Sequence, residues 1–527
     1  MRAFASLLDR LSYTPSRNDK LRLLADYFAS TPDPDRGFAL AALTDGLFVR
    51  LPFRRILGEM LKDRVDPVLY DLSRDYVGDT AETVALLWPA GKVGMLPPSL
   101  ESVVTALKAA TPATAPKLLA GWLDCLDPTG RWALLKFVTG ALRVGVSARL
   151  AKTALADWSG QKLTDIEEVW HGLRPPYAEL FAWLSGKAER PDVSAMPTFR
   201  PLMLSHQIED RELALINPEE FVAEWKWDGI RVQAVKLGWE ARLYSRTGDD
   251  ISHSFPEIVD ALPPGVVVDG ELLVMRGSEV APFNDLQQRL NRKAVTSAML
   301  KSFPAHIRLY DMLVEGEEDL RPLPLIERRA RLEAWHRAAR PPCTDISEIV
   351  SFGSIGDLEK LWSGARETGI EGLMLKRKDS PYLAGRPKGH WYKWKRAPLT
   401  LDAVLMYAQR GSGKRSSYYS DYTFGAWRGG EDGEPELVPV GKSYFGFTDD
   451  ELKELDRWVR NHTVDSFGPV RQVEPKLVFE VAFDSVHRSS RHKSGVAMRF
   501  PRVHRIRWDK PAEEADRLET LQAMIVE

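Results

Sequence analysis

The sequence predicts a multidomain protein with an all-α N-terminal domain, a central α+β domain and a small C-terminal β-barrel. The 527-residue chain is longer than one hydrophobic core can serve. Its apolar periodicity changes from helical to strand-like near residue 200, after a polar, proline-bearing stretch at 186–201. Short strands separated by Gly/Asp turns follow residue 396. We therefore expect domains at 1–190, 200–396 and 397–527.

The composition is that of an ordinary globular protein, with 44% apolar residues, 28% charged residues and a net charge of -2. Such a balance gives no overall sign of a nucleic-acid partner, so local charge has to be considered. The two cysteines, Cys125 and Cys343, exclude a disulfide framework and a four-cysteine zinc site. The N-terminus resembles neither a secretory signal nor a membrane anchor, which predicts a cytoplasmic protein with no membrane partner.

The first 185 residues or so read as successive helices, with apolar stripes such as Leu21, Leu24 and Phe28. Turn signals at 31–35 and 127–130 separate these helices. Between 133 and 156, Gly140 and Gly145 interrupt an otherwise helical pattern beside polar and basic side chains. Small residues allow either close helix packing or close approach to a phosphate backbone. The local pattern alone favours packing.

The central region mixes strand and helix patterns. Four stretches read as strands, at 221–225, 231–237, 239–245 and 266–274. The charged stretch 324–340 reads as a helix, and a second helix at 357–367 leads into a strand at 372–376. This mixture predicts an α+β domain.

The C-terminal region shows strands at 401–407, 422–427 and 476–483, and one helix at 449–460. Five or so strands in about 130 residues suggest a small closed barrel of the oligonucleotide-binding (OB) type. The run 487–510 holds eight Lys/Arg residues against one acid, so a nearly neutral chain could still bind a polyanion there.

The predicted chemistry centres on Lys226 in the stretch EWKWDGIR. This lysine follows an apolar strand and precedes an Asp-Gly turn, so it is presented at a strand end. An amine attacks a phosphate only in its neutral form, which nearby cations such as Arg231, Arg246 and Lys393 favour. Taken alone, Lys-x-Asp-Gly is more often a surface lysine beside a turn. The assignment therefore depends on partners elsewhere in the chain.

Such partners follow in order along the chain. Carboxylates suit a ribose hydroxyl or a divalent metal, cations suit phosphate, and an aromatic ring suits a purine face. At a strand period of two, Lys393 and Lys395 share one face, opposite Tyr392 and Trp394. Each motif alone could equally be a turn, a core aromatic or an edge strand. The candidates are the carboxylates Glu271 and Glu371, the cations Arg246, Lys393 and Lys395, and the aromatic Tyr310.

One stretch imitates a phosphate loop. Residues 411–414 read GSGK, but Ala408 stands where the motif requires glycine and Arg415 follows the lysine. This stretch therefore predicts only a basic turn.

Together, the motifs EWKWDGIR, SRTG, VDGE, LYDML, EGLMLK, WYKWK and RFPR…DK resemble, in order and spacing, the ATP-dependent DNA ligases of the covalent nucleotidyltransferase superfamily. The stretch TGALRVGVSARL is similar to the signature of the DNA-binding domain in the larger members. The resemblance thus covers most of the chain and is closest to a bacterial group of about this length, whose ligases are thought to act in DNA repair. It implies a helical DNA-binding domain, an adenylation domain and an OB-fold domain.

The resemblance implies a reaction in three steps. Lys226 attacks the α-phosphate of ATP, releasing pyrophosphate and forming lysyl-AMP. The AMP passes to the 5′-phosphate of a nick, and the adjacent 3′-hydroxyl then displaces AMP and seals the strand. The implied cofactors are ATP and Mg²⁺ or Mn²⁺. The implied partner is nicked double-stranded DNA, bound by a monomer that could work with a repair nuclease or helicase.

The resemblance also assigns roles to individual residues. It places Glu224 beside the adenine and Tyr310 on its face, where phenylalanine is more usual. The remaining assignments are Arg231 and Arg246 to ribose or substrate phosphate, Glu271 and Glu371 to ribose and metal, Lys393 and Lys395 to the α-phosphate, Arg386 to the triphosphate, Arg499 and Arg502 with Asp509 and Lys510 to pyrophosphate, and Thr139, Gly140, Arg143, Gly145, Ser147 and Arg149 to DNA.

Several alternatives share part of this pattern. An mRNA-capping guanylyltransferase carries most of the later motifs, but the helical N-terminal region and the RFPR ending favour a ligase. An NAD-dependent ligase normally carries a four-cysteine zinc module, and this chain has two cysteines. An RNA ligase fits the large helical domain less well. A nucleic-acid-binding protein with an inactive core would lack Lys226, Glu271 or Lys393, and all three are present.

Overall fold

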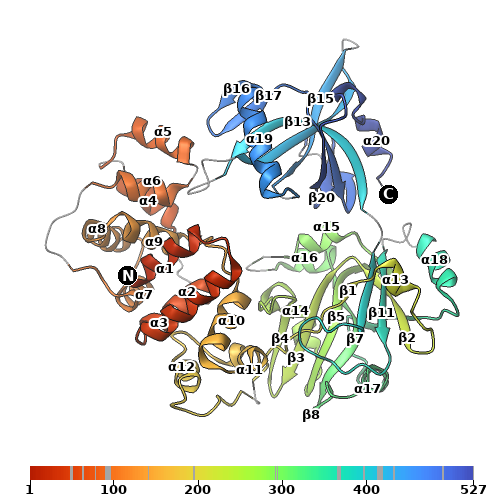
Figure 1. The fold of residues 1–527 in the computed structure, drawn as a ribbon. Helices are drawn as coiled ribbons and strands as arrows, with labels where there is room; N and C mark the ends of the chain where they lie inside the picture. The colour runs from red at the N-terminus through yellow and green to blue at the C-terminus, as the bar shows by residue number, and fades with distance from the viewer. Residues whose placement is uncertain are drawn as a thin grey trace. The chain divides into compact units, whose positions relative to one another are not determined.

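A computed structural model describes most of the chain, in a mixed helix and sheet fold (Figure 1). The phosphate-loop-like residues 412–414 and Arg491 of the basic run fall outside the described residues. The described residues are 1–525 without 48–50, 62–63, 78, 90–95, 141, 194–195, 291, 293–294, 365–369, 396–397, 412–418, 431–433, 445 and 490–491.

The chain divides into two compact units. Residues 1–151 and 397–527 form one unit, and residues 152–396 form the other. Helices make up the N-terminal part, mixed sheets and helices the middle, and mainly strands the C-terminal part. This is the predicted sequence of structural classes. No helix of the described residues is long and apolar enough to cross a membrane.

The N-terminal helices begin and end at the turn signals of the sequence. Asp127 caps the helix that starts at Pro128, accepting a hydrogen bond from the Gly130 amide at 2.7 Å. Ser16 caps its helix in the same way, because its hydroxyl accepts from the Asp19 amide. The helices are α1 (Arg2–Tyr13), α2 (Arg17–Ser30), α3 (Asp35–Leu43), α4 (Phe53–Leu61), α5 (Pro67–Val77), α6 (Thr80–Leu87), α7 (Leu100–Ala109), α8 (Ala115–Cys125), α9 (Pro128–Thr139) and α10 (Ala148–Ser159).

The glycine-containing segment 133–156 forms two helices joined by a turn. Helix α9 ends at Thr139 and is capped by Gly140, whose φ of 67° is the left-handed conformation that glycine adopts without strain. Gly145 also has a φ of 67°, and helix α10 starts three residues later. The Lys20 amine holds this turn by donating to the carbonyls of Val144 at 2.9 Å and Gly145 at 3.0 Å.

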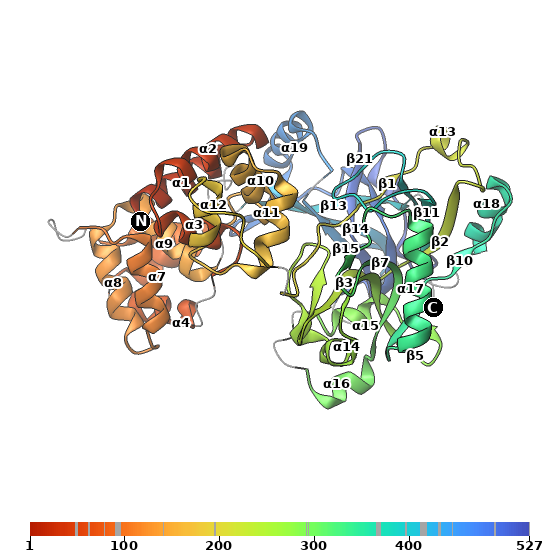
Figure 2. The ribbon, with the colours of Figure 1, turned by 90° about the horizontal axis from the view of Figure 1, so that it is seen from below.

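Residues 152–396 contain two main sheets (Figures 1 and 2). The predicted strands and helices of this region are confirmed to within a few residues at their ends. The first sheet has the order β1 (His206–Gln207), β12 (Trp391–Lys395), β11 (Ile370–Arg377), β2 (Phe221–Trp227) and β10 (Ile349–Val350). The second has the order β4 (Glu240–Ser245), β3 (Ile230–Leu237), β5 (Val266–Arg276), β7 (Ala305–Glu315) and β8 (Glu318–Asp319), with β6 (Glu279–Val280) on β5 and β9 (Thr344–Ile346) on β7.

The helices of this unit lie around the sheets. Val222 and Trp391 of the first sheet share a buried core with Val235 and Val267 of the second, so the two sheets face each other. The helices are α11 (Leu163–Val169), the 3₁₀ turn η1 (Trp170–Gly172), α12 (Ala178–Leu184), α13 (Asp210–Leu213), η2 (Ser252–Ser254), α14 (Pro256–Ala261), α15 (Phe283–Gln287), α16 (Ser297–Ser302), α17 (Leu325–Ala339) and α18 (Ile355–Gly364).

The C-terminal part has an OB-like arrangement of strands around one core. Its described residues contain nine strands, so the prediction of five or so was too low. Only the strands at 401–407, 422–427 and 476–483 were predicted by position, so several strands were missed. One of them is β16 (Thr463–Phe467), whose residues show no regular apolar alternation and are mostly exposed. The elements are β13 (Leu399–Arg410), β14 (Tyr419–Gly429), β15 (Pro435–Ser443), α19 (Asp449–Asn461), β16 (Thr463–Phe467), β17 (Val470–Val473), β18 (Val478–Phe483), β19 (Ser485–Arg488), β20 (Val496–Arg499), β21 (Arg502–Arg507), η5 (Ala512–Glu514) and α20 (Leu518–Gln522).

Candidate active site

Lys226 lies near the end of β2, in a row of residues that crosses three strands. It is paired with Gly372 on β11, and Gly372 is paired in turn with Lys395 on β12. In the next row, Glu224 faces Met374, which faces Lys393. Because strand side chains alternate between faces, the lysines of both rows project from the same face of the sheet.

A β-bulge brings a carboxylate into this row. Between Ile370 and Gly372, β11 advances two residues while β2 advances one, so Glu371 is the extra residue. The bulge directs the Glu371 side chain to the lysines, and the amines of Lys226 and Lys395 each donate to one of its carboxylate oxygens. Burial acts to raise the pKa of Glu371, but these two lysines together hold it below its ordinary value.

Glycine is required at position 372 for two reasons. Its φ of 155° lies where other residues are strained, and a Cβ atom there would approach the Trp394 carbonyl oxygen to 2.2 Å. The glycine therefore lets β11 and β12 lie close together at the bulge that presents Glu371.

Glu271 approaches Lys226 from the second sheet. Gly229, in the turn after Lys226, packs so closely on β5 that an added Cβ atom would lie 2.8 Å from Glu271 Cγ. Burial raises the pKa of Glu271 to about 7; Lys226 and Arg231 act against this rise, and Glu371 adds to it. Glu271 and Glu371 are thus close enough to interact; Glu371 lies on the strand beside Lys226, and Glu271 approaches Lys226 from the second sheet.

Four cations lie within electrostatic range of Lys393. Burial lowers the pKa of Lys393, and the repulsion of its neighbours lowers it further. These neighbours are Lys395, Arg386, Arg246 and Lys226. The predicted phosphate-binding residues are therefore gathered around one position, although they come from β2, β12, the turn after β4 and the loop before β12.

Arg246 lies in the SRTG motif, residues 245–248, which forms a tight turn. The sequence allowed two interpretations of this motif, a strand-ending turn and a cation that meets ribose or phosphate. The turn closes through the Gly248 amide, which donates to the Ser245 carbonyl at 2.9 Å, and the Ser245 and Thr247 hydroxyls lie 3.0 Å apart. The Arg246 side chain itself is exposed. The motif is therefore a strand-ending turn that also presents a cation.

Arg231 is part of a buried hydrogen-bond network. Its guanidinium donates to the Met203 carbonyl at 2.6 Å, to the Asp269 carboxylate at 2.7 Å and to the Tyr382 hydroxyl at 3.0 Å. Tyr382 in turn donates to Asp269 at 2.5 Å. The Arg231 Nε–H is buried and has no hydrogen-bond partner among the described residues. Sequence reasoning missed Asp269 and Tyr382 as partners, because only the fold brings β3, β5 and the loop after β11 together.

Tyr310 is the extra residue of a second bulge, where β7 advances two residues while β5 moves from Asp269 to Gly270. Its ring lies beneath the Lys376 amine, which is 4.2 Å from the ring centroid. Lys376 is buried and donates to the Glu224 carboxylate at 2.9 Å. The sequence contained a signal for this lysine, because side chains alternate along β11 and Lys376 therefore lies on the same face of the sheet as Gly372.

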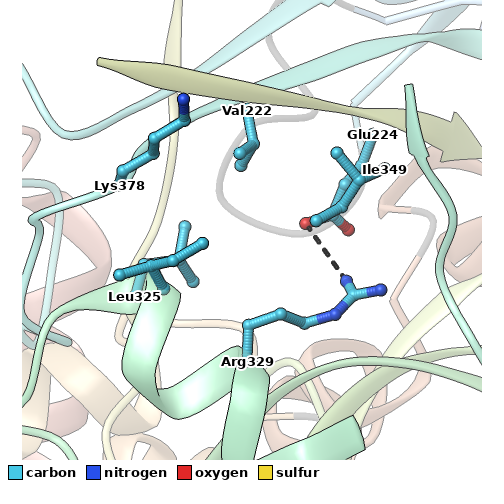
Figure 3. A pocket seen from close by; sticks show the side chains of 7 residues that line it. Val222, Glu224, Leu325, Arg329, Ile349 and Lys378 are labelled. Carbon is cyan, nitrogen blue, oxygen red and sulfur yellow. Dashed lines mark ion pairs between the residues drawn. The ribbon is translucent and has the colours of Figure 1, made fainter. Parts of the chain in front are cut away.

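Glu224 also lines a small pocket (Figure 3). Arg329 of α17 projects into this pocket, and its Nη1 lies 3.9 Å from a Glu224 oxygen. Glu224 is thus a buried carboxylate whose Oε1 lies near two cations, Lys376 and Arg329. The lining consists of Val222, Glu224, Leu325, Ile326, Arg329, Ile349 and Lys378.

The remaining candidates belong to the other unit. Arg499 ends β20, and Arg502 starts β21 and donates to Asp484 at 3.1 Å. Asp509 pairs with Arg507, whose hydrogen bonds lower the pKa of Asp509 to about 2, and Lys510 pairs with Asp402. Of the predicted DNA-binding residues, Gly140, Arg143, Gly145, Ser147 and Arg149 are exposed and Thr139 is half-buried.

Comparison with known proteins decides the family. Residues 202–395 match the ATP dependent DNA ligase domain, and residues 415–510 match the ATP dependent DNA ligase C terminal region. A probable DNA ligase of Koribacter versatilis is 37% identical over 412 residues, which cover 73% of this chain and 70% of that protein. The chain belongs to the ATP-dependent DNA ligase family. The ligase is also similar to DNA ligase 1 of Korarchaeum cryptofilum, at 30% identity over 548 residues, covering 99% of this chain and 97% of that protein.

A solved structure, Pmar-Lig_PreS3, has the same fold as the ligase, with a TM-score of 0.57 at 17% identity, covering 96% of this chain and 99% of that one. The family match confirms the interpretation as an ATP-dependent DNA ligase over a capping guanylyltransferase, an RNA ligase or an NAD-dependent ligase. The ligase therefore uses ATP to form phosphodiester bonds at nicks in DNA. A lysyl-AMP intermediate is the norm of this family.

Proposed function

We propose that Lys226 is the residue that carries AMP. The observation that supports this role is the row Lys226–Gly372–Lys395, in which Glu371 accepts hydrogen bonds from both lysines. In the first step the Lys226 Nζ forms a bond to the α-phosphorus and the bond to pyrophosphate breaks. The ion pair with Glu371 must open for the amine to reach the phosphorus.

The other residues bind and orient the nucleotide. Lys393 and Lys395 hold the α-phosphate, and Arg246 and Arg386 neutralise the charge that moves onto the phosphates during transfer. Glu224 and Tyr310 receive the adenine, and Arg231 the ribose or a substrate phosphate. Arg499 and Arg502 orient pyrophosphate when the C-terminal domain closes. These roles assume the domain limits 1–190, 200–396 and 397–527 expected from the sequence.

Mg²⁺ or Mn²⁺ fits the acids of this site. Protein-bound Mg²⁺ usually takes one or two carboxylates and completes its shell with water and substrate phosphates. Glu271 and Glu371 supply two such carboxylates, and the described residues contain no cluster of three or more His, Cys, Asp or Glu side chains. A metal there would neutralise charge on the α-phosphate.

Mapping the covalent nucleotide tests the proposal. The full-length protein is incubated with α-labelled ATP and a divalent metal, denatured and digested, and the labelled peptide is identified by mass spectrometry. We expect one labelled peptide, with AMP on Lys226, and labelling by ATP well above labelling by GTP. AMP on another lysine would overturn the assignment.

We also propose that the turn between α9 and α10 contacts the DNA backbone. Three residues of this turn have left-handed φ values (Gly140, Arg143 and Gly145), and its side chains are largely exposed. Exposed amides and cations in such turns suit phosphate groups. The resemblance further supports a cytoplasmic monomer that acts on nicked double-stranded DNA in repair, together with a nuclease or helicase.

Replacing Arg143 with glutamine should weaken nick binding about tenfold at low salt and lower the slope of log affinity against log salt by about 1. Self-adenylation should not change. Fluorescence anisotropy with a nicked duplex at several salt concentrations measures both quantities. Arg22→Gln is the matched control, because Arg22 is an exposed arginine of the same helical part that pairs with Asp19 on α2. An unchanged salt slope in Arg143→Gln would contradict the proposed phosphate contact.

A further inference from the structure

The 3₁₀ turn η1 places one histidine against the turn that carries Arg246. His171 Nε2 lies 2.7 Å from the Gly248 carbonyl oxygen, and Gly248 closes the Ser245–Gly248 hydrogen bond of that turn. In the sequence, His171 belongs to the predicted helical domain; in the structure, it lies in the same compact unit as the adenylation site. Both views show α11, the helix before His171, beside the β3–β4 end of the second sheet (Figures 1 and 2).

The packing around His171 leaves its ring little freedom. The ring centroid lies 4.8 Å from that of Tyr244 and 5.6 Å from that of Phe199. Gly248 has a φ of 85°, and a Cβ atom there would approach the His171 Cε1 to 3.3 Å. Glycine at position 248 therefore allows both the turn conformation and the close approach of the imidazole.

The surroundings also fix the protonation state of His171. Burial and the nearby Lys152 lower its pKa to about 4, against a smaller opposing effect of its bond to Gly248 and of Asp249 and Asp250. The imidazole is therefore neutral near pH 7 and carries one proton. A carbonyl oxygen accepts hydrogen bonds, so the proton sits on Nε2; Nδ1 is buried without a partner among the described residues.

We propose that His171 is a positioning residue for Arg246. By donating to Gly248, it fixes the turn that holds the Arg246 side chain beside Lys393, and so sets how well Arg246 meets a phosphate. The inference depends on the proposed phosphate-binding role of Arg246. It assigns to the segment before the adenylation region a direct part in nucleotide chemistry, in addition to its proposed place in the DNA-binding domain.

The same segment has a second anchor that does not touch the turn. Glu168 of α11 accepts a hydrogen bond from Arg321 at 2.7 Å and from Arg190 at 2.9 Å. Weakening this anchor disturbs the docking of the segment and leaves the His171–Gly248 bond in place. Glu168→Gln is therefore a matched control for loss of docking.

The test is a double-mutant cycle in the full-length protein, comparing His171→Phe, Arg246→Ala and the combination of both. Single-turnover self-adenylation gives the rate constant and the apparent ATP affinity, and thermal unfolding monitors stability. We expect each single variant to lower the rate constant divided by the apparent ATP dissociation constant about tenfold, and the double variant to be no worse than Arg246→Ala alone. His171→Gln, which can still donate to Gly248, should recover most of the activity, and Glu168→Gln should stay within about twofold of the wild type.

Three results would overturn the proposal. Effects that multiply in the double variant mean that His171 acts independently of Arg246. A loss in Glu168→Gln equal to that in His171→Phe means that docking of the segment, and not the turn, matters. If Arg246→Ala is fully active, the proposed role of Arg246 fails and this inference fails with it. If the two single effects multiply in the double variant, only this inference fails and the role of Arg246 stands. If His171→Phe lowers the unfolding temperature, His171→Asn, which is too short to reach Gly248, takes its place in the cycle.

Discussion

Replacing Lys226 with alanine should abolish self-adenylation, lowering covalent labelling by α-labelled ATP more than about 10⁴-fold. The reason is that Lys226 is the amine that β2 presents to the proposed α-phosphate position, whereas Lys395, the other amine of its row, comes from β12 and is proposed to hold that phosphate. The measurement is the fraction of protein that keeps its label after denaturation, over time and with saturating ATP and metal.

Lys236→Ala is the control for this variant. Lys236 lies on β3 in the second sheet, and its amine donates to the Leu262 carbonyl at 2.7 Å, away from the cations around Lys393. This control should label at the wild-type rate, and both variants should show wild-type far-UV circular dichroism. Labelling of a folded Lys226→Ala protein would show that another residue is the nucleophile.

Replacing Glu371 with glutamine should slow self-adenylation by about 10²-fold or more. The glutamine keeps the shape of the side chain but removes the charge that pairs with Lys226 and Lys395 and that would bind a metal. The concentration of Mg²⁺ that gives half the maximal rate should rise together with the fall in rate. Single-turnover labelling across a Mg²⁺ titration measures both.

Glu315→Gln provides the comparison, since Glu315 ends β7 and pairs with Arg331 on α17, outside the site. It should leave the rate and the Mg²⁺ dependence unchanged. A Glu371→Gln protein that reaches the wild-type rate within twofold at every Mg²⁺ concentration would remove Glu371 from the proposed mechanism.

Local patterns in the sequence predicted much of the central fold. Alternation along WYKWK placed Lys393 and Lys395 on one face, and the structure agrees, because Tyr392 and Trp394 pack in the core on the opposite face. Strand ends near Lys226 and Ser245 were also predicted within two residues. These features depend on neighbours in sequence, which is why one chain suffices to predict them.

The geometry of the site depends on contacts that are distant in sequence. The bulges at Glu371 and Tyr310 arise from how β11 pairs with β2 and β7 with β5, and no residue pattern within one strand specifies them. The link from His171 to Gly248 joins residues 77 positions apart. The motifs therefore supplied the candidate residues, whereas only the folded pairing shows how they meet.

The bulge at Glu371 also implies a trade-off between the thermal stability of the sheet and the catalytic activity of the site. A sheet without this extra residue would pair more regularly across β2, β11 and β12, and would no longer need a glycine in a conformation other residues avoid. Selection for thermal stability alone would therefore favour sequences that close this irregularity and, on the proposed mechanism, lose the carboxylate. Efforts to make this ligase more heat-resistant should leave residues 370–372 unchanged and seek improvement in the helical and C-terminal regions.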